Sequence, residues 1–145
     1  MIFVGIDPGK QGGIGVVDDT GGYVYACRLP EDDRVLTDRL RGIMQLSPGI
    51  VITLERVRSS PQMGVVSAFT FGRGYGTIRG VLAGLGATYT EVTPQAWQIA
   101  LGCRTKGDKN VTKAEAARLW SGVRMTHAIA DALLIAEYGR LQHAC

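Results

Sequence analysis

The sequence predicts a single α/β domain in which helices flank a mixed five-stranded sheet. Glycine-rich turns separate the first three predicted strands, a pattern typical of an antiparallel meander. Each later strand follows a helix, which indicates crossover connections to parallel strands. The chain has 145 residues, a length that suits one domain with one core. We therefore assign residues 1–145 to one domain.

The first half of the chain supplies the meander, one helix and a fourth strand. Apolar or alternating runs predict strands at 2–7, 14–18 and 23–29, separated by Pro-Gly and Gly-Gly steps. Apolar residues at helical spacing predict a helix over 33–46, which a Ser-Pro-Gly step ends before a strand at 50–55. The stripe of this helix consists of Val35, Leu36, Leu40, Ile43 and Met44.

The second half contains helices and one short strand. Thr93 followed by Pro94 is a good helix start, and Thr112 and Glu115 have the spacing of a capping box. The predicted elements are a helix over 64–85, a strand over 88–92, a helix from Thr93 to near Gly102, a basic loop over 103–111, a helix from Thr112 to Trp120 and a helix over 126–141.

Composition and charge exclude several classes of protein. Hydrophobic residues make up 46% and charged residues 20%, which excludes a disordered chain. No apolar run approaches the roughly 18 residues of a membrane span, and the N-terminus has the pattern of neither a signal nor a transit peptide. Three distant cysteines, Cys27, Cys103 and Cys145, fit free thiols rather than a disulfide framework or a zinc site.

The net charge of +3 is unevenly distributed. Residues 1–55 carry five basic and eight acidic side chains, whereas residues 56–145 carry eleven basic and five acidic ones. Such an asymmetry indicates a polyanionic partner for the second part of the chain. Solvated surface charge explains it equally well at this stage.

Three carboxylates stand at structurally marked places. Asp7 ends the first strand, Glu55 ends the fourth, and Asp131 lies inside the apolar last helix, one turn after His127. If the fourth strand lies parallel beside the first, Asp7 and Glu55 leave the sheet at the same edge. Crowded carboxylates repel one another, and divalent cations with oxygen ligands relieve the conflict. Two such ions can activate water and stabilise the leaving oxygen of a phosphodiester.

Each of these residues also has a structural explanation. Asp7 before Pro-Gly fits a turn residue, Glu55 fits a surface group, and His127 fits a structural histidine. Asp131 is harder to explain, because an aspartate in an apolar helix is costly without a partner. The combination favours a metal site.

Three segments of the sequence resemble the acidic motifs of the RuvC-type Holliday junction resolvases of the ribonuclease H superfamily. They are GIDPGKQGGIGVVD, ITLERV and HAIADALLIAEYG. The likeness is greatest to the short phage and chloroplast members, whose middle regions are similar to SAFTFGRGYGTIRGVL and VTPQAW here. The resemblance implies a ribonuclease H-like fold over nearly the whole chain.

The resemblance also implies an activity, a magnesium-dependent endodeoxyribonuclease that resolves four-way DNA junctions by paired symmetric cuts in recombination and repair. It implies that Asp7, Glu55 and Asp131 bind two Mg²⁺ or Mn²⁺ ions, with His127 as the fourth catalytic and metal-binding residue. Ala128 replaces a glycine frequent in the family. The implied partners are branched DNA and a second copy of the chain, with no nucleotide cofactor and no membrane. The implied location is the cytoplasm of a bacterial or phage-infected cell.

Basic and aromatic side chains complete the predicted DNA interface. The candidates for phosphate contact are Arg56, Arg58, Arg73, Arg79, Arg104, Lys106, Lys109 and Lys113. Lys106 and Lys109 lie where the family carries catalytic-site lysines, and the sequence does not decide between them. The candidates for contact with an opened junction centre are Met63, Phe69, Phe71 and Tyr75. Phe69 and Phe71 fit core positions equally well.

Small residues recur at four-residue spacing along the helix predicted over 64–85. They are Ala68, Gly72, Gly76, Gly80 and Gly84. Because glycine inside a helix costs up to about 1 kcal/mol relative to alanine, the row needs an explanation. One is close packing on the protein's own sheet, and the other is a two-fold dimer with two active sites.

Three other functions compete with junction resolution. A nuclease of the same fold could act on flaps, other branched DNA or structured RNA. The glycine-rich segment after Asp7 also resembles the first phosphate loop of actin and sugar-kinase ATPases, although those bind nucleotide between two such domains. A non-catalytic nucleic-acid-binding module is the third alternative, and three retained carboxylates argue against it.

Overall fold

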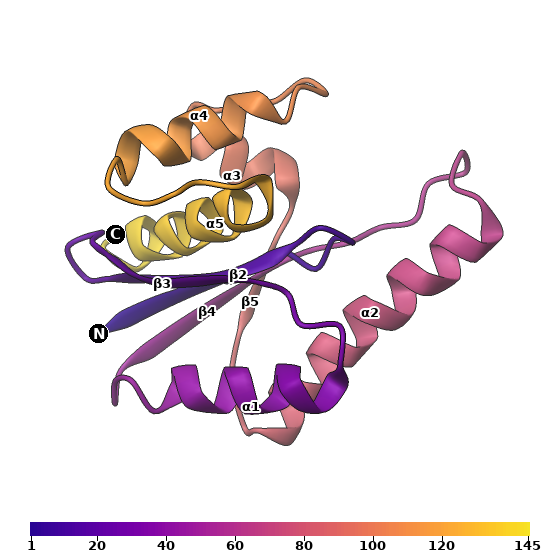
Figure 1. The fold of residues 1–145 in the computed structure, drawn as a ribbon, viewed down its shortest axis with the longest axis horizontal. Helices are drawn as coiled ribbons and strands as arrows, with labels where there is room; N and C mark the ends of the chain where they lie inside the picture. Colours follow the sequence, from indigo (N-terminus) through magenta and orange to yellow (C-terminus); the bar gives the residue numbers. More distant parts are fainter.

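The computed structural model describes residues 1–145 and contains one five-stranded sheet in the order β3-β2-β1-β4-β5 (Figure 1). The strands are β1 (Ile2–Ile6), β2 (Gly13–Asp18), β3 (Tyr23–Arg28), β4 (Ile50–Glu55) and β5 (Thr90–Val92). The β1–β2 and β2–β3 pairs are antiparallel, and β4 pairs in parallel with β1 and with β5. The predicted mixed sheet, with β1 at its centre, is confirmed.

The register of the central strands brings two chain segments to the same edge. Ile6 is paired with Leu54 across the parallel β1–β4 ladder. Asp7 and Glu55, each the next residue along its strand, therefore lie side by side where neighbouring strands are about 4.8 Å apart. The prediction that both carboxylates leave the sheet at one edge is confirmed.

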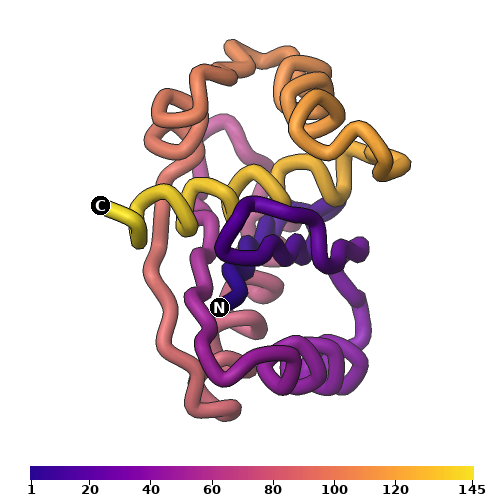
Figure 2. The backbone as a smooth tube through the Cα atoms, turned by 90° about the vertical axis from the view of Figure 1, so that its left-hand side faces the viewer, coloured from indigo at the N-terminus to yellow at the C-terminus, as the bar shows by residue number.

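Helices cover both faces of the sheet. They are α1 (Asp33–Met44), α2 (Val65–Gly84), α3 (Pro94–Ala100), α4 (Asn110–Leu119) and α5 (His127–His143). Helix α5 crosses one face with α3 and α4 outside it, and α1 and α2 lie on the other face (Figures 1 and 2). Each face has its own apolar cluster: one joins the sheet to α1 and α2, and the other joins it to α3, α4 and α5.

Helix α5 lies unusually close to the sheet because β1 and β2 present glycines to it. A Cβ atom on Gly5 would lie 2.1 Å from the carbonyl oxygen of Ala132, and one on Gly15 would lie 2.5 Å from the backbone nitrogen of Leu133. Such distances are far inside van der Waals contact. The glycines therefore bring α5, and Asp131 with it, against the centre of the sheet.

Most predicted elements agree with the structure to within two residues, and the start of α4 is the main correction. Helix α4 begins at Asn110, so Thr112 lies inside it and is not its cap. The Asp108 carboxylate accepts a hydrogen bond from the backbone of Asn110, which starts the helix earlier. The Thr112 hydroxyl instead donates to the carbonyl of Lys109. On α1, Val35 of the predicted apolar stripe is 46% exposed.

Two further observations concern the chain as a whole. None of the helices is long and apolar enough to cross a membrane. Cys27, Cys103 and Cys145 are unpaired, as predicted.

Candidate active site

Asp7 opens a tight turn between β1 and β2. Its backbone exchanges two hydrogen bonds with Gly13, and its Oδ1 accepts one from the backbone nitrogen of Gly9 at 2.9 Å. A Cβ atom on Gly12 would lie 2.0 Å from the carbonyl oxygen of Asp7, so this turn requires glycine there. The turn holds the Asp7 carboxylate at the edge of the sheet.

Glu55 ends β4 beside Asp7 and is held from the other side by α3. The indole nitrogen Nε1 of Trp97 donates a hydrogen bond to Glu55 Oε2 at 2.7 Å. Trp97 is completely buried, so this donor has a defined position.

Asp131 reaches the same region from the first half of α5. Its Oδ1 is buried and has no hydrogen-bond partner, an exception to the rule that buried polar atoms are paired. His127, one turn earlier on the same helix face, is exposed.

The electrostatics of the three carboxylates indicate that they share one region. The pKa of Asp7 is raised to about 6, chiefly by burial and in part by the neighbouring Asp131. Burial also raises the pKa of Glu55 to about 8, with additional contributions from Asp7 and Asp131. The pKa of Asp131 is raised by burial as well. Burial and mutual repulsion therefore disfavour the ionised forms of these carboxylates, and the nearby positive charge does not offset this.

The cations and donors around this charge belong to α4 and α5. Lys109, at the start of α4, lowers the pKa of both Asp7 and Asp131. The Thr112 hydroxyl and His127 also lower the pKa of Asp131. Lys106 has no such influence on the carboxylates; it lies in the preceding loop with a φ of 47°. Of the two candidate lysines, Lys109 is the one whose charge lowers the pKa of these carboxylates.

A bound cation fits this donor set. The orphaned Oδ1 of Asp131 and the raised pKa values of three convergent carboxylates both mark a place that lacks positive charge. Oxygen ligands of this kind suit Mg²⁺ or Mn²⁺. As the side chains are placed, no three acidic, histidine or cysteine residues lie close enough together to hold an ion. The carboxylates interact electrostatically but do not form a closed ligand set.

Two predicted phosphate contacts, Arg56 and Arg79, are already paired. Both guanidinium groups approach the carboxylate of Glu91 on β5, at 3.3 Å and 3.9 Å, and Arg79 also donates to the Tyr89 hydroxyl at 3.0 Å. More than 40% of each arginine side chain remains exposed, so Glu91 orients these groups without removing them from the surface.

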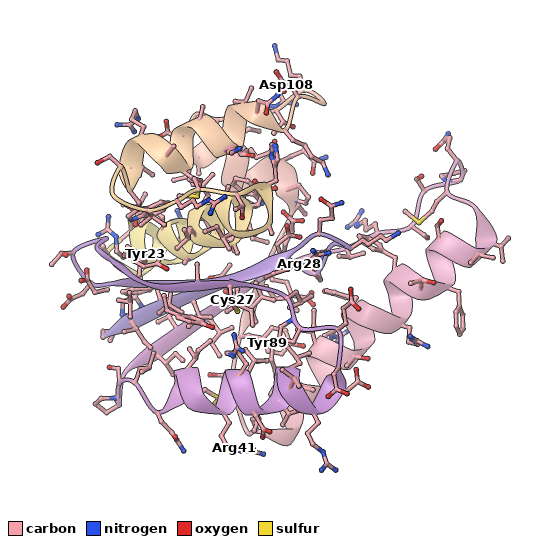
Figure 3. The ribbon with its side chains drawn as sticks, in the orientation of Figure 1. Tyr23, Cys27, Arg28, Arg41, Tyr89 and Asp108 are labelled. Atoms are coloured by element: carbon pink, nitrogen blue, oxygen red, sulfur yellow. The ribbon has the colours of Figure 1, made fainter.

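The other predicted phosphate contacts lie on three segments. Arg58 is exposed between β4 and α2, Arg73 is exposed on α2, and Arg104 is exposed in the loop before α4. Lys113 is half-buried on α4. The loop before α4, with Asp108 at its tip, is at the outer end of the molecule (Figure 3).

The four predicted junction-centre residues differ in exposure. Phe69 is 70% exposed on α2, whereas Phe71 and Met63 are intermediate. Tyr75 packs against the cluster under α1 and α2 and donates its hydroxyl to Glu91. Their contact with DNA stays a prediction, and Phe69 is the most accessible of the four.

The sequence analysis missed three residues around the site. Trp97 lies inside a predicted helix without being singled out, Glu91 is not among the candidates, and Thr112 is predicted as a cap. A signal for Trp97 existed, because a tryptophan at an inward helical position needs an acceptor for its N–H. Glu91 and Thr112 gave no comparable signal, since their partners lie on segments distant in sequence.

Comparison with known proteins shows the fold. No protein-family model and no curated protein sequence matches the chain. Among solved structures, RuvC of Thermus thermophilus in complex with a Holliday junction substrate has a TM-score of 0.73 at 18% identity, covering 99% of this chain and 95% of that one. A second Thermus thermophilus RuvC structure has a TM-score of 0.66 at 19% identity, covering 95% and 92%. The chain therefore has the ribonuclease H-like fold of RuvC, as predicted.

Proposed function

We propose that this protein is a metal-dependent endonuclease that resolves four-way DNA junctions. The observation that carries the proposal is the convergence of Asp7, Glu55 and Asp131 at one sheet edge, on a fold shared with a RuvC that was solved with a Holliday junction. The uncompensated charge and the orphaned Asp131 oxygen support binding of two Mg²⁺ or Mn²⁺ ions by these carboxylates and His127.

The ions would supply the positive charge that activates water and stabilises the leaving oxygen of a phosphodiester. Asp7 holds its position through the Gly9 backbone, and Glu55 does so through Trp97. Asp131 offers an oxygen with no other partner. His127, exposed one turn earlier on the same helix, would bind or orient the second ion. Lys109 supplies a positive charge beside the phosphate, where charge develops during cleavage.

Basic side chains on both sides of the carboxylates support a DNA track. Arg56 and Arg58 follow Glu55 directly, and Arg104, Lys106 and Lys113 surround Lys109 along the chain. Contacts of this kind position a duplex and make binding salt-dependent. We therefore propose that junction arms lie along the β4–α2 connection and the loop before α4.

The experiment that tests the function is cleavage of end-labelled four-way junction, flap and plain duplex DNA, with Mg²⁺ and with EDTA. We expect paired symmetric nicks in the junction, lost with EDTA and lowered at least about 10³-fold in Asp7→Asn. Asp18→Asn is the matched control, because Asp18 also ends a strand but lies at the opposite edge of the sheet. It should cleave as the wild type does.

Other outcomes select other functions. Equal cleavage of flaps or structured RNA would indicate a broader nuclease of the same fold. Metal-independent binding of junctions without any cleavage would indicate a non-catalytic module. Full activity of Asp7→Asn would contradict the proposed site.

We also propose that the protein acts as a homodimer through α2, since two symmetric cuts require two sites. A Cβ atom added to Gly72, Gly76, Gly80 or Gly84 would meet no other element within 4 Å, so close packing on the protein's own sheet does not explain these glycines. Val65 and Phe69, which are 86% and 70% exposed, share the face of Gly72, Gly76 and Gly80 by helical spacing. The first turns of α2 stand away from the rest of the fold (Figure 1).

Sedimentation velocity tests the dimer. Gly76→Leu should shift the protein to the monomer, because a leucine side chain prevents close approach of two helices. Gly42→Leu on α1, also at a helical glycine with open space around it, is the matched control and should stay dimeric. A monomeric wild type at all concentrations would contradict the proposal.

A further inference from the structure

Trp97 is the largest completely buried side chain of the protein, and its one polar atom contacts a carboxylate of the site. Its indole lies in the cluster between α3, α4 and α5. The Nε1 atom donates to Glu55 Oε2 at 2.7 Å. When Glu55 is ionised, as it would be with a cation bound, such a hydrogen bond is stronger than one between neutral groups.

Helix α3 is anchored so that this indole has little freedom. Thr93 accepts a hydrogen bond from the backbone of Ala96, and Pro94 occupies the first turn. At the other end, the carbonyl of Gln98 accepts a hydrogen bond from the backbone N–H of Cys103. The side-chain Oε1 of Gln98 accepts one from the backbone N–H of Thr105. Both ends of this short helix are thus tied, and the donor cannot follow Glu55 if the carboxylate rotates.

The chemistry of the donor suits a metal ligand. An indole N–H is neutral and offers one hydrogen bond. It can therefore orient Glu55 without cancelling its charge, whereas a lysine or arginine in the same place would compete with a cation. Only Oε2 is engaged by Trp97, so Oε1 is not held by this donor. The Gly9 backbone N–H, also neutral, engages one oxygen of Asp7 in the same way.

We propose that Trp97 is a positioning residue, whose indole N–H orients the Glu55 carboxylate for a divalent cation. The inference rests on the proposed function in taking Glu55 as a metal ligand. Groups that hydrogen-bond to metal ligands tune affinity, and their loss typically lowers metal affinity or activity about 10–100-fold.

The chain offers a matched control in its second tryptophan. Trp120 lies in the same apolar cluster and is 6% exposed. Its Nε1 donates to the carbonyl oxygen of Gly21 at 2.9 Å, in the β2–β3 turn. Replacement of either tryptophan by phenylalanine removes one indole hydrogen bond within the same apolar cluster. Only Trp97→Phe removes the bond to Glu55.

The experiment compares Mn²⁺ binding by the wild type, Trp97→Phe, Trp120→Phe and Asp7→Asn in isothermal titration calorimetry without DNA. We expect Trp97→Phe to bind Mn²⁺ about 10–100-fold more weakly, and Trp120→Phe to bind as the wild type does. In cleavage assays, Trp97→Phe should need a proportionally higher Mg²⁺ concentration for half-maximal rate. Its rate at saturating Mg²⁺ should stay within a few-fold of the wild type. A merely structural role would lower thermal stability in both variants and leave Mn²⁺ affinity unchanged.

The possible failures are distinguishable. If Trp97→Phe binds Mn²⁺ as tightly as the wild type while Asp7→Asn does not bind it, the positioning role is overturned and the proposed function stands. If the wild type neither binds Mn²⁺ nor cleaves DNA, the proposed function fails and the inference fails with it.

A second variant addresses the case in which Trp97→Phe does not fold. In a Trp120→Phe background, Trp97 is replaced biosynthetically by benzothienylalanine, which keeps the bicyclic shape and replaces the N–H by sulfur. Weakened Mn²⁺ binding by this protein supports the inference, and unchanged binding overturns it.

Discussion

Glycines lie under α5 and along α2, but only those under α5 touch a neighbouring element. Gly5 and Gly15 of the sheet face the backbone of α5 so closely that a Cβ atom would lie 2.1 Å and 2.5 Å from it. Gly72, Gly76 and Gly80 of α2 have open space around them. Both sets permit close approach of a backbone, but only at Gly5 and Gly15 does a backbone of this chain lie close by.

The two helices also differ in burial and in the functional residues they carry. Helix α5 carries Asp131 and is buried along most of its length, whereas α2 buries only Ile78 and Leu82. The comparison teaches that the glycines beneath α5 fix the position of that helix, whereas the glycines of α2 leave open space that the proposed dimer would fill. Substitutions on the two faces should therefore have effects of different size and sign.

The largest effect is expected for Gly5→Ala. The added methyl group would collide with the backbone of Ala132 and Ala136, and backbone cannot move aside as a side chain can. We expect a loss of about 3 kcal/mol or more in the free energy of unfolding, measured by urea denaturation and circular dichroism. Gly42→Ala, in open space on α1, is the control. Equal stability of both variants would show that α5 does not lie where we describe it.

The next effect concerns the dependence of stability on pH. The pKa of Asp7 rises from 3.8 to about 6 on folding, and that of Glu55 from 4.5 to about 8. The folded state therefore binds protons more tightly than the unfolded state. The stability due to these groups is complete below about pH 4 and is lost as the pH rises through the two folded-state values.

In EDTA, we expect the free energy of unfolding to fall between pH 5 and pH 8, on the order of 2–5 kcal/mol in total. The double variant Asp7→Asn with Glu55→Gln should lose this dependence. Mg²⁺ should reduce it in the wild type, since a bound cation favours the charged carboxylates. Urea titrations at several pH values measure all three, and a stability that rises over this range would contradict the raised pKa values.

A smaller effect on cleavage is expected to distinguish Lys109, whose charge acts on the site carboxylates, from Arg79 on α2. Lys109 interacts with Asp7 and Asp131, whereas Arg79 is paired with Glu91. We expect Lys109→Ala to lower the cleavage rate about 10²-fold, with junction affinity changed only a few-fold. Lys106→Ala is the matched control for loss of a nearby lysine. Arg79→Ala should weaken binding a few-fold and leave the single-turnover rate unchanged. If Lys106→Ala or Arg79→Ala lowered the cleavage rate more than Lys109→Ala does, the role proposed for Lys109 would be wrong.

The sequence predicts the sheet and its helices well because each depends on local patterns. Hairpin turns, alternating strands and the apolar stripe of α1 are short-range signals. The same signals place Asp7 and Glu55 at one edge, since parallel pairing of β1 and β4 follows from the helix between them. Even the start of α4 is missed by only two residues.

What could not be predicted depends on contacts between distant segments. The bond from Trp97 to Glu55 joins residues 42 positions apart, and the pairing of Arg56 with Glu91 joins residues 35 apart. The sequence likewise left open whether the α2 glycines pack on the sheet. That question needs the direction of α2, which is set by burial of Ile78 and Leu82 and by no local pattern.

The smallest effect, and one of opposite sign, is expected for Gly76→Ala on α2. Because a Cβ atom there meets nothing within 4 Å, alanine gains helix propensity without a clash. At protein concentrations where the chain is monomeric, we expect the free energy of unfolding to rise by about 0.5–1 kcal/mol. Sedimentation equilibrium at higher concentration should show a weaker dimer, because the methyl group lies on the proposed contact face. A variant that is more stable as a monomer yet poorer as a dimer would mean that the glycine is kept for the partner. An unchanged dimer would place the partner on another face.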